Sequence, residues 1–426
     1  MRNSTRAKRW LLNDNVATHV VAAFLLVAFY YMAYRYPLQY GSTKTSPTYG
    51  DTPVVWQMGK YVLLSVLFIA TLLLSMYKSN QRPQTLGRLP FTGWLLAIIG
   101  MFAFVRGIFL DNTNLIELGI VSVSVVGITL LSRQCALDLL ALVRITFIYA
   151  VVSVAFEAIQ VGLFLWVGRL PNLGYADNVS VRFGATLDDP NSWAILIALL
   201  LPVCWISLAS QNRLRWVVCA ALALTLPLTQ SLTGMVVVPV VLALLGTIYH
   251  RKLILATIRA YLVRSVLILV SSLLLVLSGL WFLSTSKWFE AFLSSKRGSV
   301  NQRAGSVEGL VSMNFLEVLG FGEDKKFYES NYVSLLYGVG LPITLAYLFC
   351  GLLSIIVLYK AAQRVGSRRG AMLWGLCAFQ ASYLLGSISL QYSGIYPLNL
   401  IYVLTVAIAT FTFTSRAKAN ADLIDA

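Results

Sequence analysis

Charged side chains are scarce in this chain. Only 12% of its 426 residues are Asp, Glu, Lys or Arg, whereas a soluble globular domain carries about 25%. Hydrophobic residues make up 58% and gather into about twelve blocks, most of them near the ~20 residues that span a bilayer. Because lipid offers the backbone no hydrogen-bond partners, each block must form a helix. The scarcity of charge therefore excludes a soluble fold and predicts an all-α, polytopic membrane helix bundle, a single domain over residues 1–426.

Histidine and cysteine are also rare. The two histidines, His19 and His250, fall at helix ends that we expect on the cytoplasmic side, so neither is available as an outward base. The five cysteines show neither a zinc spacing nor a disulfide framework. A Gly-rich phosphate loop and an HExxH motif are missing as well. The sequence thus predicts no metal and no cofactor, and outward chemistry would use carboxylates, arginines, hydroxyls or amides.

Acidic residues are the rarer charge sign, since 17 Asp and Glu stand against 33 Lys and Arg. In a soluble protein this excess would suggest nucleic acid, but here the basic residues lie in short loops between apolar blocks. Alternate loops carry about 20 and about 10 of them, and such an asymmetry places the richer set in the cytoplasm. We therefore expect a multi-pass protein with both termini cytoplasmic and with no nucleic-acid partner.

The apolar blocks give the expected helix positions. These lie near 16–34, 55–76, 91–110, 115–132, 139–166, 191–208, 214–229, 232–249, 262–284, 331–358, 371–390 and 395–414. A long outward loop, 285–330, separates the ninth helix from the tenth, and loops of more than ~12–15 residues are usually functional or disordered. Within it Val307, Leu310, Val311 and Val318 recur at helical spacing. This spacing predicts a short amphipathic helix near 305–319, packed on the bundle.

One outward segment, 182–191, ends a polar loop and opens the sixth helix. Asp189 is placed to cap that helix and Pro190 to begin it. Arg182 is either a solvated loop cation or a ligand for an anionic head group, because a guanidinium binds phosphate through paired hydrogen bonds. The segment therefore combines a structural helix start with a candidate anion site.

Further polar residues flank the later outward loops. Ser231 and Thr233 precede Gly234 in what is either a capping turn or part of a site. Arg303 precedes the amphipathic stretch. Glu329 stands at the outer lip of the tenth helix. Three roles are open for it: a base, an ion-pair partner of Arg303, or an acid that the helix dipole favours at a helix start.

Five polar residues fall inside apolar blocks, where they are costly and often functional. Lys60 and Arg106 lie near helix ends, and we expect both to extend their charged groups toward water. Glu157 is deeper, near Gln160. We favour a structural pair between Glu157 and Arg144 over a substrate contact.

Taken together, these segments resemble the O-antigen polymerase and ligase family of bacterial membrane glycosyltransferases, over roughly residues 145–345. The family shows an Arg-x-x-Gly segment before a Pro-Asn helix start and then a Ser/Thr-Gly junction. A long outer loop with an Arg and a Gly-x-Gly follows, and last comes an acid-or-His segment whose Tyr precedes a Gly. The matching positions here are Arg182, Gly184, Pro190, Asn191, Ser231, Thr233, Gly234, Arg303, Gly320, Gly322, Glu329, Tyr332 and Gly340.

The chain departs from the family at two places. The Ser/Thr-Gly junction often carries an Arg in relatives, whereas Leu232 and Thr233 stand here. Ligases use a His in the last segment, where this chain has Glu329, Ser330 and Asn331. The missing His favours a polymerase over a ligase.

The resemblance implies an all-helical GT-C-type fold in a bacterial cytoplasmic (inner) membrane. It implies a polymerase that joins undecaprenyl-pyrophosphate-linked oligosaccharide units into a surface polysaccharide, such as an O-antigen or exopolysaccharide, by inverting, metal-independent transfer at the outer face. The implied roles are stabilisation of the leaving pyrophosphate by Arg182 and Arg303 and activation of the acceptor hydroxyl by Glu329. The residues expected to bind substrate are Asp188, Asn191, Ser231, Thr233, Asn331 and Tyr332. The expected partners are these lipid-linked oligosaccharides, membrane lipid, a flippase and a chain-length regulator.

Three alternatives remain at this point. A ligase would transfer finished polymer to another acceptor. A lipid-linked sugar flippase or other transporter would show matching halves with broken helices, and no such halves are evident in the sequence. A structural subunit of an export complex is compatible with every feature above.

Overall fold

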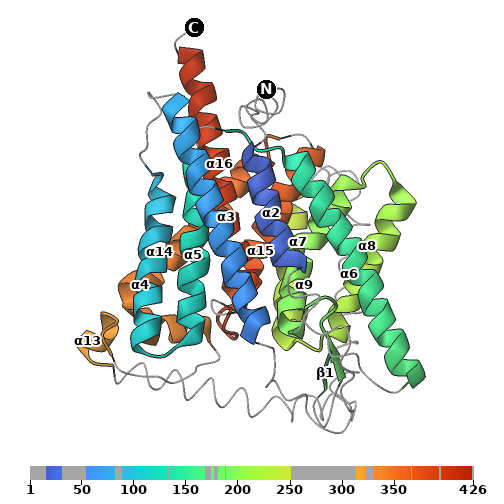
Figure 1. Cartoon of the computed structure of the whole chain (residues 1–426). Helices are drawn as coiled ribbons and strands as arrows, with labels where there is room; N and C mark the ends of the chain where they lie inside the picture. Colours follow the sequence, from blue (N-terminus) through green and yellow to red (C-terminus); the bar gives the residue numbers. More distant parts are fainter. Residues whose placement is uncertain are drawn as a thin grey trace, which may run out of the picture.

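The computed structural model describes residues 16–30, 54–81, 89–132, 135–167, 174–176, 181–187, 189–250, 313–322, 330–365, 367–392 and 395–424. Almost all of these residues are helical (Figure 1). The helices are α2 (Val16–Tyr30), α3 (Val54–Gln81), α4 (Phe91–Phe109), α5 (Thr113–Leu131), α6 (Leu139–Val167), α7 (Pro190–Ser207), α8 (Asn212–Leu228), α9 (Leu232–Tyr249), α13 (Phe315–Val318), α14 (Asn331–Ala362), α15 (Ser367–Gly386) and α16 (Leu398–Ile424). Strands β1 (Gly174–Ala176) and β2 (Val181–Phe183) form a short antiparallel hairpin.

The long helices lie at their predicted positions, with shifts of a few residues at most ends. The helix start that the sequence marked at Asp189 and Pro190 is capped as expected. Asp189 accepts the backbone N–H groups of Asn191 and Ser192 at 3.1 and 2.9 Å, so α7 begins at Pro190. α16 continues to Ile424, beyond its predicted end. The predicted ninth helix, 262–284, lies outside the described residues.

Several of these helices have the length and apolarity of membrane spans. Among the described residues, seven helices are long and apolar enough to cross a membrane, namely α3, α4, α5, α6, α7, α9 and α14. Two shorter apolar helical segments are α2 and the first part of α16. This set fits a multi-pass membrane protein. The number of twelve spans and the GT-C type stay predictions.

Two hydrogen bonds identify the helix termini that gather at one end of the bundle. The backbone N–H of Asp138, before α6, donates to Thr18 Oγ1 of α2 at 2.8 Å. Thr414 Oγ1 of α16 donates to the carbonyl of Ser132, after α5, at 3.0 Å. Figure 1 shows this end at the top and the β hairpin and α13 at the bottom. We call the first the basic end and the second the hairpin end.

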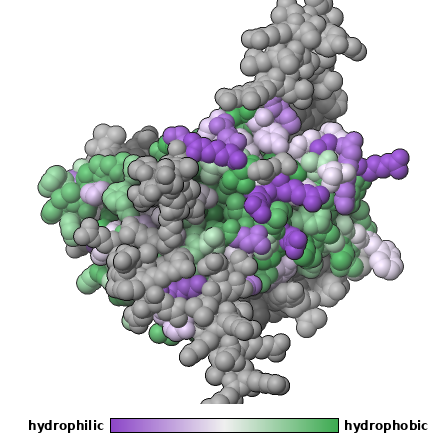
Figure 2. Space-filling model, turned by 90° about the horizontal axis from the view of Figure 1, so that it is seen from above, coloured by the Kyte–Doolittle hydropathy of each residue, from purple (hydrophilic) through white to green (hydrophobic). Residues whose placement is uncertain are grey.

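The basic end carries most of the described cationic side chains. They lie near the ends of their helices, at Lys78, Arg144, Arg213, Arg215, Lys360, Arg364, Arg368 and Arg369. Figure 2 looks onto this end and shows hydrophilic side chains across it. The described side chains therefore show the charge asymmetry that the sequence predicts. That this end faces the cytoplasm stays a prediction.

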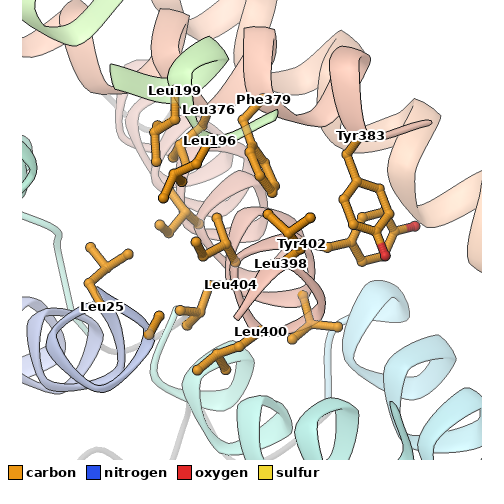
Figure 3. Packing of buried hydrophobic residues seen from close by; sticks show 14 of the residues in the cluster. Leu25, Leu196, Leu199, Leu376, Phe379, Tyr383, Leu398, Leu400, Tyr402 and Leu404 are labelled. Carbon is orange, nitrogen blue, oxygen red and sulfur yellow. The ribbon is translucent and has the colours of Figure 1, made fainter. Parts of the chain in front are cut away.

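The centre of the bundle is apolar and is built from α7, α15 and α16. Figure 3 shows leucines of α7 and α16 and aromatic rings of α15 meeting there, with Leu25 of α2 nearby. The peripheral helices instead carry exposed apolar side chains, such as Leu73 on α3 and Leu224 on α8, which are 61% and 68% exposed. A large exposed apolar surface marks contact with a membrane or another protein, and on helices of this length and apolarity it fits a lipid-facing layer.

Lys60 lies inside this bundle, which corrects the prediction that its ammonium extends to water. Its ammonium pairs with Glu117 of α5. The Tyr61 hydroxyl donates to the same carboxylate oxygen at 3.0 Å, and Asn399 Nδ2 of α16 donates to the other at 3.0 Å. The charge is neutralised and both oxygens are bound, which is what a carboxylate needs in lipid. This cluster joins α3, α5 and α16.

Replacing Glu117 tests this pairing. Glu117→Leu leaves the Lys60 ammonium buried without its counter-charge, and we expect a loss of about 3–5 kcal/mol in the free energy of unfolding. Adding Lys60→Met should recover part of that loss, because no charge is then buried. Unfolding of the detergent-solubilised protein, followed by circular dichroism, measures both effects. The control is Arg144→Gln at an exposed position, which should change stability by no more than ~0.5 kcal/mol.

The predicted topology is tested by labelling. The five native cysteines are all buried, so they should react little with a membrane-impermeant thiol reagent. A cysteine replacing Phe315 at the hairpin end, where that side chain is 75% exposed, should be labelled in intact spheroplasts. A cysteine replacing exposed Gln211 at the basic end should be labelled only after the membrane is permeabilised. Labelling of the second position in intact spheroplasts would contradict cytoplasmic termini.

Candidate functional site

A buried turn follows β2 and leads the chain into α7. Gly184, Ala185, Thr186 and Leu187 are all buried, although they connect two elements at the hairpin end. The backbone N–H of Leu187 donates to the carbonyl of Gly184 at 2.9 Å. A Cβ on Gly184 would lie only 2.4 Å from the Leu187 oxygen, so the turn needs glycine there. Gly184, two residues after Arg182, therefore has a steric reason to be glycine.

This turn packs against a polar stripe on α6. Tyr149, Ser153, Glu157 and Gln160 recur every three or four residues, so they share one helix face, and each is at most 1% exposed. The hydroxyl of Thr186, in the buried turn, lies 2.7 Å from the Tyr149 hydroxyl and 3.2 Å from Ser153 Oγ. The segment that carries Arg182 is thus attached to α6 through hydroxyl groups.

Glu157 is the acidic member of this stripe. Its Oε2 accepts the indole N–H of Trp193, in the first turn of α7, at 2.9 Å. Within the described residues, its Oε1 and both amide atoms of Gln160 have no hydrogen-bond partner. Buried polar atoms without partners are rare, and each one needs an explanation such as a bound group.

The predicted pair between Glu157 and Arg144 does not form. The two residues are thirteen positions apart on one helix, which places them about 20 Å apart along its axis. Arg144 is exposed near the basic end, whereas Glu157 is buried toward the hairpin end. The rise of the helix therefore rules out the structural pair that we favoured from the sequence.

Two predicted substrate-binding residues contact the same short segment just after α15. Thr233 Oγ1, in the first turn of α9, lies 2.7 Å from Ser389 Oγ. Asn331, at the start of α14, donates its backbone N–H to the carbonyl of Ser387 at 3.0 Å and its side-chain amide to Ser387 Oγ at 3.3 Å. These residues are far apart in the sequence and meet at the hairpin end.

The remaining described members of the set lie close by. The Tyr332 hydroxyl donates to the carbonyl of Leu384, on α15, at 2.5 Å. Ser231 caps α9 by accepting the N–H of Gly234 at 3.2 Å. Asn191 donates its side-chain amide to Asp189 at 3.1 Å within the first turn of α7, and α7 packs against both α9 and α15. The starts of α7, α9 and α14 therefore share one region.

A break in α14 completes this region. Gly340 has φ 78° and ψ 171° inside the helix, and Gly320, after α13, has φ 93°. A Cβ on Gly340 would lie 2.4 Å from the Gly320 nitrogen, and one on Gly320 would lie 2.5 Å from the Val339 oxygen. The two backbones touch, and only glycine permits the contact. Two glycines of the family-like segments are thus explained by packing.

Arg106 of α4 stabilises this break, which corrects the prediction that it only extends toward water. Pro342 has no N–H to donate to the carbonyl of Gly338, four residues earlier. Arg106 Nε donates to that carbonyl at 3.3 Å, and its Nη2 donates to the carbonyl of Gly322 at 2.5 Å. Arg106 forms no ion pair with any residue in the described part of the chain. It is therefore a cation without a counter-charge among those residues.

The structure also corrects the helix predicted over 305–319. Met313 and Asn314 are not helical, and α13 begins only at Phe315, because Asn314 caps it in a reciprocal pair with Glu317. None of the side chains of α13 is buried. The other apolar positions of that prediction, Val307, Leu310 and Val311, lie outside the described residues.

Part of the predicted site also lies outside the described residues. This is true of Asp188, Arg303 and Glu329, and of the side chain of Arg182, whose backbone lies in β2 opposite Tyr175. The described residues contain no group of three His, Cys, Asp or Glu side chains that would hold a metal ion. The described region offers hydroxyls, amides, the carboxylates of Glu157 and Asp189, and the guanidinium of Arg106.

Sequence reasoning missed several members of this region. Thr186, Trp193, Ser387 and Ser389 were not singled out. The stripe on α6 carried a usable signal, because its polar residues recur at helical spacing through an apolar block. The serine partners just after α15 carried none, since a pair of serines near a helix end is common.

Comparison with models of known protein families returned no match for this chain, and comparison with curated proteins returned none either. The resemblance to the O-antigen polymerase and ligase family therefore rests on the ordered segments alone.

The glycine contact gives a stability prediction. Gly340→Ala should lower the free energy of unfolding by about 3 kcal/mol or more, because φ 78° with ψ 171° lies in a region that is essentially restricted to glycine. Gly162→Ala is the matched control, since a Cβ there meets no atom within 4 Å in the middle of a helix, and it should be neutral or stabilising by up to ~1 kcal/mol. Thermal unfolding in detergent micelles, followed by intrinsic fluorescence, compares the two. Equal midpoints would contradict the close contact.

Proposed function

We propose that this chain is a membrane glycosyltransferase that polymerises lipid-linked oligosaccharides at the hairpin end of the bundle. The observation that supports this most is the convergence of the family-like segments. The buried turn after Arg182, the Ser231–Gly234 junction, the Gly320–Gly322 segment and the start of α14 all lie at one end. Residues separated by more than 150 positions are in contact there, as Thr233 and Ser389 are.

The polar groups of this region suit a sugar substrate. Hydroxyl and amide side chains, from Thr233, Asn331 and Tyr332 to their serine partners, supply donors and acceptors of the kind that sugars bind. Asn331 is fully buried and bound to Ser387, so its part is to position the start of α14 and the chain just before it. Ser231 and Asn191 likewise hold helix starts in place.

In the proposed reaction, the residues that act on the substrate lie next to those that hold the helix starts in place. The growing chain leaves its lipid pyrophosphate and moves to a hydroxyl of the incoming unit, with inversion at the sugar carbon. The leaving group carries negative charge, so fixed cations lower the barrier more than an acid would. Arg182 and Arg303 are the proposed cations, and Glu329 is the proposed base for the acceptor hydroxyl.

Arg106 is a positioning residue in this scheme. It binds carbonyl groups on both sides of the stretch 323–329, because Gly322 precedes that stretch and Gly338 follows it. Glu329 belongs to the stretch between these two carbonyls, so Arg106 holds the chain in place before and after it. This assigns a reason to an arginine that the family-like motifs do not include.

A flippase is the second candidate, and two observations favour it. Transporters often use broken helices near the middle of the membrane, and polar residues inside membrane helices often mark a substrate pathway. The break at Gly340 and the unpaired atoms of Glu157 and Gln160 are features of that kind. The two functions predict different locations for the lipid-linked unit when the protein is missing. A missing polymerase leaves single units on the outer leaflet, and a missing flippase leaves them on the cytoplasmic leaflet.

The polymerase proposal is tested by replacing the two proposed cations. Arg182→Ala and Arg303→Ala should each reduce polymer formation by ~10²–10³-fold, the usual effect of losing one donor to a developing charge. Single lipid-linked units should accumulate while protein level stays normal. Lysine at either position should restore little activity, because it lacks the paired donors of arginine. Gel analysis of polymer and mass spectrometry of extracted lipid-linked units give the readouts.

The matched control is Arg213→Ala, an exposed arginine at the basic end. It should leave polymer unchanged. Normal polymer in both the Arg182 and Arg303 variants would contradict the mechanism. Accumulation of single units on the cytoplasmic leaflet would favour the flippase instead.

A further inference from the structure

A groove opens at the basic end of the bundle, and the proposed sugar site lies at the hairpin end. It has a volume of about 800 Å³ and lies between the start of α6, the end of α14, the start of α15 and the later part of α16. This size is within the range of ligand pockets, ~300–1,000 Å³. No residue of the proposed sugar site lines it.

The wall of this groove is apolar. Leu353, Ile356 and Val357 of α14 face Phe411 of α16 across it, and Leu373 of α15 contributes as well. Ile356 is 49% exposed although it lies in a membrane-spanning helix. An apolar wall of this kind accepts a hydrocarbon chain more favourably than it accepts water.

The rim of the groove is cationic. Lys360 and Arg364 stand at the end of α14, and Arg369 stands in the first turn of α15. None of the three forms an ion pair with a residue in the described ranges. The acidic lining residue, Asp138, accepts the backbone N–H of Leu140 at 3.0 Å at the start of α6. Three cations and one acid leave the rim with a formal charge of +2.

The combination of these two features points to one class of ligand. A free phosphate would match the cations but not the apolar wall, and a neutral lipid would match the wall but not the cations. We infer that this groove binds an anionic phospholipid, with its phosphate at Lys360, Arg364 and Arg369 and an acyl chain along α14 and α16. Basic pockets between membrane helices bind acidic lipid head groups in this way.

The bound lipid would contact several helices at this end. Residues of α6, α14, α15 and α16 all line the groove, so a lipid in it touches each of these helices. α14 is also the helix that is broken at Gly340 near its other end. The inference does not depend on the proposed glycosyl transfer.

The experiment uses the purified full chain in a neutral detergent, stripped of co-purified lipid, and native mass spectrometry. Titration with phosphatidylglycerol should give one retained lipid with an affinity at least tenfold above that of phosphatidylcholine with the same acyl chains. Glycerol 3-phosphate, the head group without the chains, should not compete at equal concentration. Raising the salt concentration should weaken binding, because the attraction at an exposed rim is screened.

Variants locate the site. Lys360→Gln, Arg364→Gln and Arg369→Gln should each weaken phosphatidylglycerol binding roughly fivefold, and Val357→Trp should block the groove for any phospholipid. Arg368→Gln is the matched control, because Arg368 neighbours Arg369 but donates to Ser210 Oγ at 3.0 Å and does not line the groove. It should bind the lipid as the parent does.

Three results would overturn the inference. One is equal retention of the two phospholipids by the parent protein, which needs no variant to fold. Another is full competition by glycerol 3-phosphate, which would indicate a site for free anions. The third is an unchanged affinity in the Lys360, Arg364 and Arg369 variants.

Discussion

The contact between the backbones of Gly320 and Gly340 is the constraint on which the hairpin end depends. It breaks α14 inside a membrane-spanning segment, where a carbonyl that loses its helical partner costs several kcal/mol unless the protein supplies another. Arg106 supplies the donor that Pro342 lacks, and Thr344 Oγ1 donates to the carbonyl of Gly340 at 2.8 Å. Two carbonyl groups at the break are therefore bound by side-chain donors. The glycine contact fixes where the chain after α13 meets α14. It thereby fixes where this end of the long 285–330 segment meets the helix bundle.

The two buried carboxylates among the described residues, Glu117 and Glu157, differ in how many hydrogen-bond and charge partners they have. Glu117 has a cation and two neutral donors, so both of its oxygens are bound and it joins three helices. Glu157 has a single donor, from Trp193, and lies beside Gln160, whose amide atoms are unpaired among the described residues. A fully bound group stabilises the bundle, whereas a partly bound one keeps capacity for a further partner. This difference separates a carboxylate with both oxygens bound from one that keeps an oxygen without a partner among the described residues.

Local features of the chain could be predicted from the sequence, and contacts between distant residues could not. Helix positions follow from apolar blocks, and the start of α7 follows from Asp189 and Pro190, because both depend on neighbouring residues only. The pairing of Lys60 with Glu117 joins residues 57 positions apart, and both ends of such a pair look like ordinary polar residues near helix ends. The helix predicted over 305–319 failed for a local reason, since Asn314 has the side chain of a helix cap and apolar spacing does not report caps.

The candidate site was found in part because its glycines and helix starts form an ordered set. The serine partners of Thr233 and Asn331, just after α15, could not be predicted, because these contacts depend on how the helices pack.

The central position of α7 has a consequence for how the protein is made. α7 is buried along nearly its whole length, and it packs on α15, whose first residue follows that of α7 by 177 positions. At ~5–20 residues per second, a ribosome needs roughly 10 to 30 s to produce that intervening chain. During this time α7 lacks the partner that will enclose it. The nascent protein therefore passes through a stage in which its future core faces lipid or the insertion machinery, and closure of the bundle must await translation of α15.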